Sequence, residues 1–173
     1  QIRQHELLQE EASKDELTGL YNRRAWEKLL RAEEERCKQY GHPAAVLFID
    51  LNDLKKVNDS LGHDEGDKLI QNAAQVLRDN VRINDIVARL GGDEFVILLS
   101  EVDSAEQAAV AAEKIRQSFS ASFQLPSHSL TITASIGVVC AAAATLNTEP
   151  LLAMADQAMY RAKQLGGNRC IQY

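Results

Sequence analysis

The residues of this chain best suited to chemistry are two adjacent carboxylates, Asp93 and Glu94, which follow a pair of glycines. Apolar residues at 86–88 and 96–99 flank this segment, which is the pattern of a β-hairpin with a tight turn. Neighbouring carboxylates repel each other unless water solvates them or a cation lies between them. Taken alone, the hairpin favours solvated carboxylates at an exposed turn over a cation site.

A third carboxylate, Asp50, follows the apolar run 44–49, which we expect to be a central strand covered on both faces. If the hairpin lies beside this strand, three acids meet at one edge of the sheet, and oxygen-only ligation suits Mg²⁺. Adjacent strand residues point to opposite faces. Asp93 and Glu94 can therefore share a metal only if Gly91 and Gly92 bend the chain, which glycines do at low steric cost.

The elements that must position these acids can be predicted from periodicity and capping signals. We expect helices at 23–40 with Asn22 as N-cap, 51–60, 67–80, 105–119 and from about 148 to 165, with a glycine-rich turn at 61–66. We expect strands at 44–49, 86–99 as the hairpin, 130–139 and, at the sheet edge, 169–173. This order predicts an α+β fold: a single-domain α/β sandwich with a central, mostly antiparallel sheet of about five strands flanked by helices.

Composition sets further limits on the class of protein. The chain has 173 residues, 45% of them hydrophobic and 25% charged, with a net charge of −6, as expected for one globular domain. There is no basic stripe for nucleic acid, and no segment suggests membrane contact. The three cysteines are odd in number and widely spaced, which favours a reducing compartment. Residues 1–14 are polar and helix-prone, so we expect an N-terminal linker helix, with one domain at 15–173.

Five blocks of the sequence, in the same order, resemble the GGDEF domain, the diguanylate cyclase family. They are residues 15–24, 50–67, 89–95, 135–137 and 155–163. The resemblance implies a fold like the palm of nucleotidyl cyclases. It also implies that two GTP molecules are joined into cyclic di-GMP with release of two pyrophosphates. Each GTP would be held by one copy of a homodimer, and each 3′-hydroxyl would attack the α-phosphate of the other GTP.

The resemblance also implies which residues hold the metal. Asp50, the carbonyl of Leu51, Asp93 and Glu94 would bind Mg²⁺ or Mn²⁺, with two ions per active site. Asp50, Asp93 and Glu94 are the expected catalytic residues, and Asp93 is the best candidate for the general base. The metals would neutralise charge on the phosphates and ease deprotonation of the hydroxyl.

Two positions match those that read guanine in the family, Asn58 and Asp67. A carboxylate can accept from guanine N1–H and N2–H, and an amide can reach the O6 or N3 edge. Each residue also has a purely structural alternative. Asp67 could simply N-cap its helix, and Asn58 could simply end one.

The triphosphate would be bound by backbone N–H groups around Asp53, Leu54 and Lys55, and by Lys163. A lysine near a helix C-terminus can also simply complement the helix dipole. Two departures from the family pattern bear on this site. Gly167 stands where the family commonly has a phosphate-binding Arg, which should weaken γ-phosphate binding, and Asn52 replaces the second Asp of a common Asp-x-Asp.

The pair Arg82 and Asp85 precedes the hairpin and resembles the family's inhibitory product site. Arg82 could stack on a guanine of cyclic di-GMP, and Asp85 could accept from its N–H groups. The plainer alternative is an i,i+3 ion pair.

Three functions follow as hypotheses. The first is an active diguanylate cyclase with feedback inhibition, in the cytoplasm or as the cytoplasmic part of a membrane-anchored parent, under an upstream sensor domain. The second is a non-catalytic module that senses GTP or cyclic di-GMP. The third is a dimerising interaction domain whose acids are merely solvated.

Overall fold

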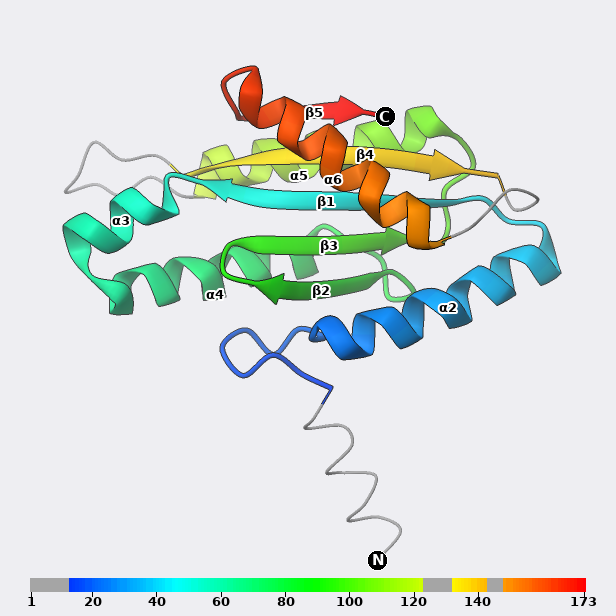
Figure 1. Ribbon diagram of the computed structural model, residues 1–173, viewed down its shortest axis with the longest axis horizontal. Helices are drawn as coiled ribbons and strands as arrows, with labels where there is room; N and C mark the ends of the chain where they lie inside the picture. The colour runs from blue at the N-terminus through cyan, green and yellow to red at the C-terminus, as the bar shows by residue number, and fades with distance from the viewer. Residues whose placement is uncertain (1–12, 123–131, 143–147) are drawn as a thin grey trace, which may run out of the picture.

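The computed structural model describes residues 13–122, 132–142 and 148–173, with backbone only at 121–122 and 148–149. A five-stranded sheet in the order β2-β3-β1-β4-β5 forms its centre (Figure 1). The strands are β1 (Ala44–Asn52), β2 (Ile86–Gly91), β3 (Glu94–Leu99), β4 (Thr133–Ala141) and β5 (Arg169–Gln172). All pairs are antiparallel except β4 with β5. The predicted α+β sandwich with a mostly antiparallel sheet is therefore confirmed.

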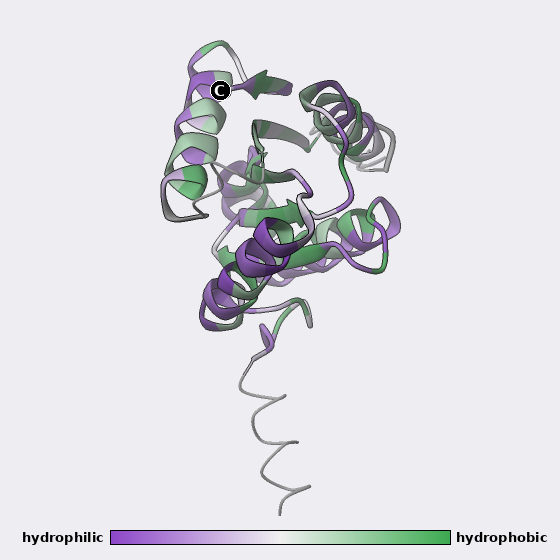
Figure 2. Ribbon diagram, turned by 90° about the vertical axis from the view of Figure 1, so that its right-hand side faces the viewer, coloured by the Kyte–Doolittle hydropathy of each residue, from purple (hydrophilic) through white to green (hydrophobic). Residues whose placement is uncertain are grey.

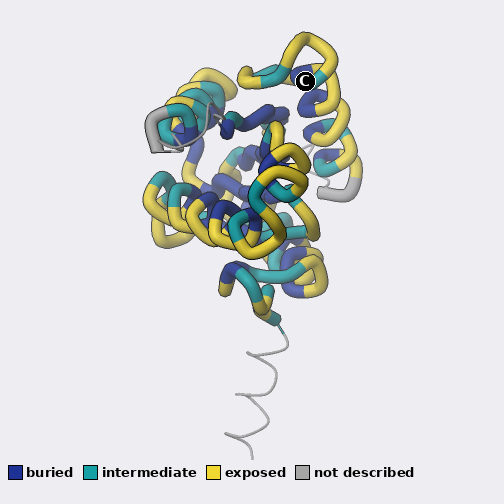
Figure 3. Tube along the Cα trace, turned by 90° about the vertical axis from the view of Figure 1, so that its left-hand side faces the viewer, coloured by how far each residue is buried: buried dark blue, intermediate teal, exposed yellow. Residues whose placement is uncertain are grey.

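Strand β1 is central because its residues are buried on both faces, as a continuous apolar run predicts. Leu47, Ile49 and Leu51 belong to the core under α3, α4 and α5, whereas Val46 and Phe48 belong to the core under α2 and α6. Figure 2 shows hydrophobic strands between helices that carry hydrophilic residues outward, and the strands are buried in Figure 3.

Five described helices cover the sheet: α2 (Arg23–Tyr40), α3 (Leu54–Leu61), α4 (His63–Asp79), α5 (Ala105–Ser122) and α6 (Thr148–Gln164). As predicted, the Asn22 side chain caps α2 by accepting from the Ala25 N–H at 3.0 Å. The N-cap of α6, nearly all of the linker helix at 1–14, and residues 130–131 of the predicted strand lie outside what the structure describes. None of the described helices combines the length and hydrophobicity that a membrane span needs.

The boundaries between β1 and α3 were predicted wrongly. The strand continues through Asp50 to Asn52, and α3 starts at Leu54 instead of Leu51. The reason is pairing with β4, which extends to the Asn52–Thr133 pair. The Asn52 amide donates to Thr133 Oγ1 at 2.9 Å and accepts from Ser135 Oγ at 3.0 Å. These long-range bonds hold Asn52 in the sheet.

The predicted turn at 61–66 is also wrong, because α4 starts at His63 rather than at 67. Gly62, with φ +90°, alone reverses the chain between the two helices. Gly66 instead lies buried inside α4, where a Cβ would come within 1.7 Å of Asn58 Oδ1. This second glycine permits close contact between α3 and α4 rather than a turn.

Candidate active site

The tip of the β2–β3 hairpin carries Asp93 and Glu94, as predicted. Gly91 and Gly92 have φ values of +144° and +50°, and the register shifts between Arg89 and Gly91. The backbone carbonyl of Asp93 accepts from the Leu51 N–H at 3.1 Å. The tip is therefore bent by its glycines and joined to β1 directly beside Asp50.

Asp50 and Glu94 are direct partners in the β1–β3 register. Partners of this kind project from the same face of a sheet, which here is the face covered by α6. The Asp50 side chain is buried, and its Oδ2 lies 2.6 Å from Lys163 Nζ. Its Oδ1 has no hydrogen-bond partner among the described residues.

The raised pKa of Asp50 shows that Lys163 alone does not balance the charge of this buried carboxylate. Burial, together with the nearby Asp93 carboxylate, raises the pKa of Asp50 to about 7, against the opposing hydrogen bond and charge of Lys163. Two ionised carboxylates cannot hydrogen-bond to each other, so Asp93 leaves Oδ1 unpartnered when both are charged. An unpartnered, buried carboxylate oxygen at a tip with two further acids fits a divalent metal ion.

The prediction that all three acids bind one shared metal ion needs their side chains to lie close together. Within the residues that the structure describes, no three His, Cys, Asp or Glu side chains are close enough together to hold a metal ion. The arrangement brings Asp93 near Asp50 and places Glu94 on the same face of the sheet. A shared ion bound by all three acids stays a prediction.

Lys163, predicted to bind phosphate, forms an ion pair with Asp50, and its side chain is about one-third exposed. It is near the end of α6, which the glycine pair 166–167 stops, with the Gly167 N–H donating to Ala162 O at 2.9 Å. Gly167 has φ +75°, and a Cβ there would be 3.0 Å from the Asn52 amide nitrogen. The glycine that replaces the family's Arg therefore suits both the backbone and its neighbour.

The loop between β1 and α3 is a one-residue turn that leads directly into a helix N-terminus. Asp53 adopts the left-handed conformation, with φ +68°, and α3 begins directly after it. Backbone N–H groups in the first turn of a helix have no intrahelical acceptor, and here they include those of Leu54 and Lys55. Leu54 is buried and anchors the turn, whereas Lys55 is exposed.

The guanine-reading candidates Asn58 and Asp67 lie on the two helices of the α3–α4 pair. Asp67 is inside α4 and exposed, so the alternative in which it N-caps the helix is wrong. The Asn58 backbone carbonyl does accept from the Gly62 N–H at the end of α3, at 2.9 Å. Its side chain, however, packs against Gly66, where the absence of a Cβ leaves room for it.

Arg82 and Asp85 lie at the opposite, open end of the hairpin, in the wall of a cavity of about 550 Å³. Asp85 accepts from the backbone N–H groups of Arg82 at 2.8 Å and Ser100 at 3.2 Å. The Arg82 guanidinium is 3.6 Å from the Glu101 carboxylate. The i,i+3 contact is therefore a backbone cap rather than the ion pair of the plainer alternative. Lys114 on α5 also lines this cavity, and nothing near it in the sequence indicates that role.

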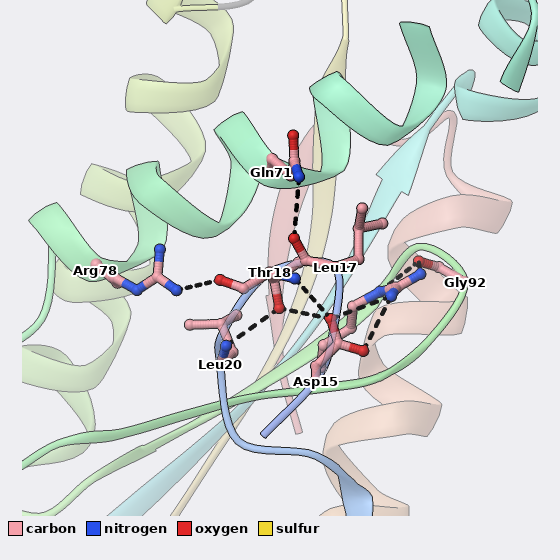
Figure 4. Close-up of polar contacts among 8 residues, drawn as sticks. Asp15, Leu17, Thr18, Leu20, Gln71, Arg78 and Gly92 are labelled. Carbon is pink, nitrogen blue, oxygen red and sulfur yellow. Dashed lines mark hydrogen bonds and ion pairs between the residues drawn. The ribbon is translucent and has the colours of Figure 1, made fainter. Parts of the chain in front are cut away.

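A second set of contacts that sequence reasoning missed joins the tip to the N-terminal turn, residues 13–21 (Figure 4). The Arg89 guanidinium donates to Gly92 O at 2.9 and 3.1 Å and to both carboxylate oxygens of Asp15 at 3.1 and 3.2 Å. From α4, Gln71 donates to Leu17 O, and Arg78 donates to Thr18 O. The only signals for this network in the sequence were an arginine just before the glycine pair and an acid in a turn-rich segment.

Comparison with known proteins matches residues 12–169 to the family described as diguanylate cyclase, GGDEF domain. The chain is 36% identical to the probable diguanylate cyclase DgcC of Escherichia coli (strain K12), over 94% of this chain and 43% of DgcC. It is 35% identical to the cyclic di-GMP phosphodiesterase NbdA of Pseudomonas aeruginosa, over 95% of this chain and 21% of NbdA. The chain thus spans less than half the length of these curated relatives.

A solved structure of the coiled coil and GGDEF domain of DgcB from Caulobacter crescentus, in complex with c-di-GMP, superposes with a TM-score of 0.90. The two sequences are 26% identical, and the aligned region covers 99% of this chain and 92% of the DgcB chain. Sequence and structure agree: the chain belongs to the diguanylate cyclase GGDEF domain family.

Proposed function

We propose that this domain condenses two GTP molecules into cyclic di-GMP and two pyrophosphates, across a homodimer in which each copy holds one GTP. Each 3′-oxygen forms a bond to the α-phosphorus of the other GTP, and the bond from that phosphorus to pyrophosphate breaks. The observation that carries this proposal is Asp50, a buried carboxylate with one unpartnered oxygen beside Asp93. The identity with DgcC supports it.

Asp50, the Leu51 carbonyl, Asp93 and Glu94 would hold Mg²⁺ or Mn²⁺, two ions per site. Bound there, the metal supplies positive charge against the triphosphate and lowers the pKa of the attacking hydroxyl. Asp93 is the group to accept the hydroxyl proton, because it sits on the bent tip and is half-buried. Asp50 and Glu94 then act as fixed negative charges that hold the site's cations in place.

GTP would be oriented by the chain's own groups at both of its ends. The carboxylate of Asp67 accepts from guanine N1–H and N2–H, and Asn58 contacts the adjacent edge of the base. Backbone N–H groups of the turn at Asp53, Leu54 and Lys55 bind the β- and γ-phosphates, as helix N-termini do. Lys163, exposed enough to leave Asp50, would complete the phosphate site.

Cyclic di-GMP would inhibit the enzyme from the cavity at the open end of the hairpin. Arg82 supplies an exposed guanidinium for stacking and for phosphate, while the half-buried Asp85, bonded to the Arg82 backbone N–H, holds the rim of the cavity. Lys114 adds a second cation to the same wall. The DgcB structure with c-di-GMP supports ligand binding by this family.

The unit that performs this chemistry would be residues 15–173, with residues 1–14 as the linker from an upstream sensor domain; residues 13 and 14 of that linker already belong to the N-terminal turn and are not helical. The DgcB structure, whose coiled coil and GGDEF domain together cover 99% of this chain, supports that division. The use of GTP as substrate supports a cytoplasmic location for the domain.

Incubation with GTP and Mg²⁺, followed by chromatography, tests the proposal. Cyclic di-GMP and pyrophosphate should appear at a ratio of one to two. The rate of product formation should rise more steeply than in proportion to protein concentration, because two copies must meet. GTP binding without any product at high protein concentration would replace the proposal with the sensor hypothesis. The match to NbdA, named as a phosphodiesterase, and Gly167 favour that alternative.

A further inference from the structure

We propose that Arg89 is a positioning residue: with Asp15 it fixes the Gly92–Asp93 segment of the hairpin tip and thereby couples the N-terminal turn to the metal-binding acids. The inference rests on the proposed function, in which Asp93 accepts a proton and holds metal. It adds a role for two residues, Arg89 and Asp15, that need not touch GTP or metal themselves.

The Arg89 side chain divides its donors between two separate segments of the chain. Nε and Nη2 both donate to Gly92 O, while Nη1 donates to the two oxygens of Asp15 (Figure 4). The side chains of Arg89 and Asp15 are only 14% and 19% exposed, so water screens this ion pair weakly. The planar guanidinium can serve both acceptors at once, which a lysine ammonium cannot do with the same fixed geometry.

This contact acts directly on Asp93, because the peptide groups on both sides of its Cα are held. The carbonyl before it, Gly92 O, is bound by Arg89, and its own carbonyl is bound by the Leu51 N–H. Gly91 and Gly92 give the tip conformational freedom. Arg89 removes that freedom from the second glycine, so the direction of the Asp93 side chain depends on it.

The other end of the link is equally well anchored. Asp15 accepts from the Thr18 N–H at 3.0 Å and the Thr18 hydroxyl at 2.7 Å, and the backbone N–H of Arg89 donates to Tyr21 O at 2.9 Å. The N-terminal turn and the strand leading to the tip thus form one bonded unit. Since the chain enters this turn directly from residues 1–12, a change in how that segment is held reaches Asp93 through Asp15 and Arg89.

Steady-state kinetics of Arg89→Gln and Asp15→Asn in the full chain test the proposal. Misplacement of a catalytic group by about 1 Å costs about 100-fold, so we expect kcat to fall about 30- to 100-fold in Arg89→Gln. We expect KM for GTP to stay within about threefold, since the base and phosphate sites are elsewhere. The Arg89→Gln/Asp15→Asn double variant should lose no more than Arg89→Gln alone, because both substitutions break one link.

Arg78→Gln is the matched control, since Arg78 also donates to the N-terminal turn but makes no bond to Gly92. Amide hydrogen exchange gives a readout without turnover. The Leu51 N–H, bonded to Asp93 O, should exchange at least about tenfold faster in Arg89→Gln and at the wild-type rate in Arg78→Gln. Arg89→Lys should recover part of kcat through a bond to one of the two acceptors.

Unchanged kcat in Arg89→Gln, additive losses in the double variant, or equal acceleration of Leu51 exchange in the Arg78→Gln control would each overturn the proposal. Failure of the proposed function looks different, because the wild-type protein itself would then make no cyclic di-GMP. In that event the hydrogen-exchange comparison still decides whether Arg89 holds the tip.

Discussion

An aspartate whose pKa is raised by burial lies beside each end of the β2–β3 hairpin, Asp85 before β2 and Asp50 on β1, yet the two aspartates are bonded differently. At the open end, both carboxylate oxygens of Asp85 accept backbone N–H groups. Beside the tip, one oxygen of Asp50 is bound by Lys163 and the other has no described partner.

This difference separates a preformed pocket from a site that a ligand must complete. A buried polar group left unsatisfied costs about 1–3 kcal/mol, and more when it is charged, so Asp50 is a place where a bound cation would add stability. Asp85 needs nothing further, and it serves as part of the wall of the cavity. The tip should therefore depend on metal, and the open end should bind its ligand without metal.

Substitution of the incomplete aspartate should have the largest effect. In Asp50→Asn we expect kcat for cyclic di-GMP synthesis to fall about 10³-fold, because the charge that holds the metal against the phosphates is lost. Asp156→Asn, which changes an exposed acid on α6, is the control and should keep its activity. Comparable activity in both variants would remove Asp50 from the site.

Substitution at the preformed end should act on inhibition. We expect Arg82→Ala to raise the cyclic di-GMP concentration for half-inhibition about 30-fold, since an exposed guanidinium that can stack on guanine and bind phosphate is lost. Initial rates measured with added product give this value. The neighbouring exposed side chain removed in Ile83→Ala should shift it by less than about threefold, and equal shifts in both variants would argue against the assignment.

The close contact of α3 with α4 at Gly66 allows a test of the proposed guanine-binding site, separately from the product site at the open end. The Cβ added in Gly66→Ala must displace the Asn58 side chain, so we expect KM for GTP to rise about tenfold. Ser60→Ala, on the exposed side of α3, is the control. A matching rise in the product concentration for half-inhibition would contradict the separation of the two sites.

The smallest expected effect is the pH dependence of stability. From about pH 4 to about pH 7, folded Asp50 retains a proton that the unfolded chain releases. In metal-free buffer its contribution to the free energy of unfolding therefore falls as pH rises through this window. Asp50→Asn should remove that fall and gain about 1–2 kcal/mol at about pH 8. Urea unfolding at several pH values measures both, and a slope that Asp50→Asn leaves unchanged would contradict the raised pKa.

Much of the fold was predictable because its signals are local. The buried run at 44–49, the Asn22 cap and the glycine pair at the tip each depend on neighbouring residues, and each is confirmed. The start of α4 was not predictable from the same rules. Gly66 looks like part of a turn in the sequence, but it is required by packing against Asn58 on another helix.

The site divides in the same way. Asp50, Asp93 and Glu94 could be collected from strand ends and the hairpin pattern, and the structure pairs Asp50 with Glu94 where β1 meets the start of β3, with Asp93 nearby. The contact of Lys163 with Asp50 and the bonds of Arg89 to Asp15 join segments far apart in the chain. Periodicity carries no information about such pairs, so only the folded arrangement shows them.

The most direct test of the central claim, that the two ends of one hairpin act as separate sites, uses Asp93→Asn. Titration calorimetry of this variant with cyclic di-GMP in metal-free buffer measures binding at the open end. An assay of cyclic di-GMP synthesis on the same preparation reports on the tip. We expect the Kd for cyclic di-GMP to stay within about threefold of the wild-type value. A Kd weakened more than about tenfold, or synthesis retained by this variant, would contradict the account.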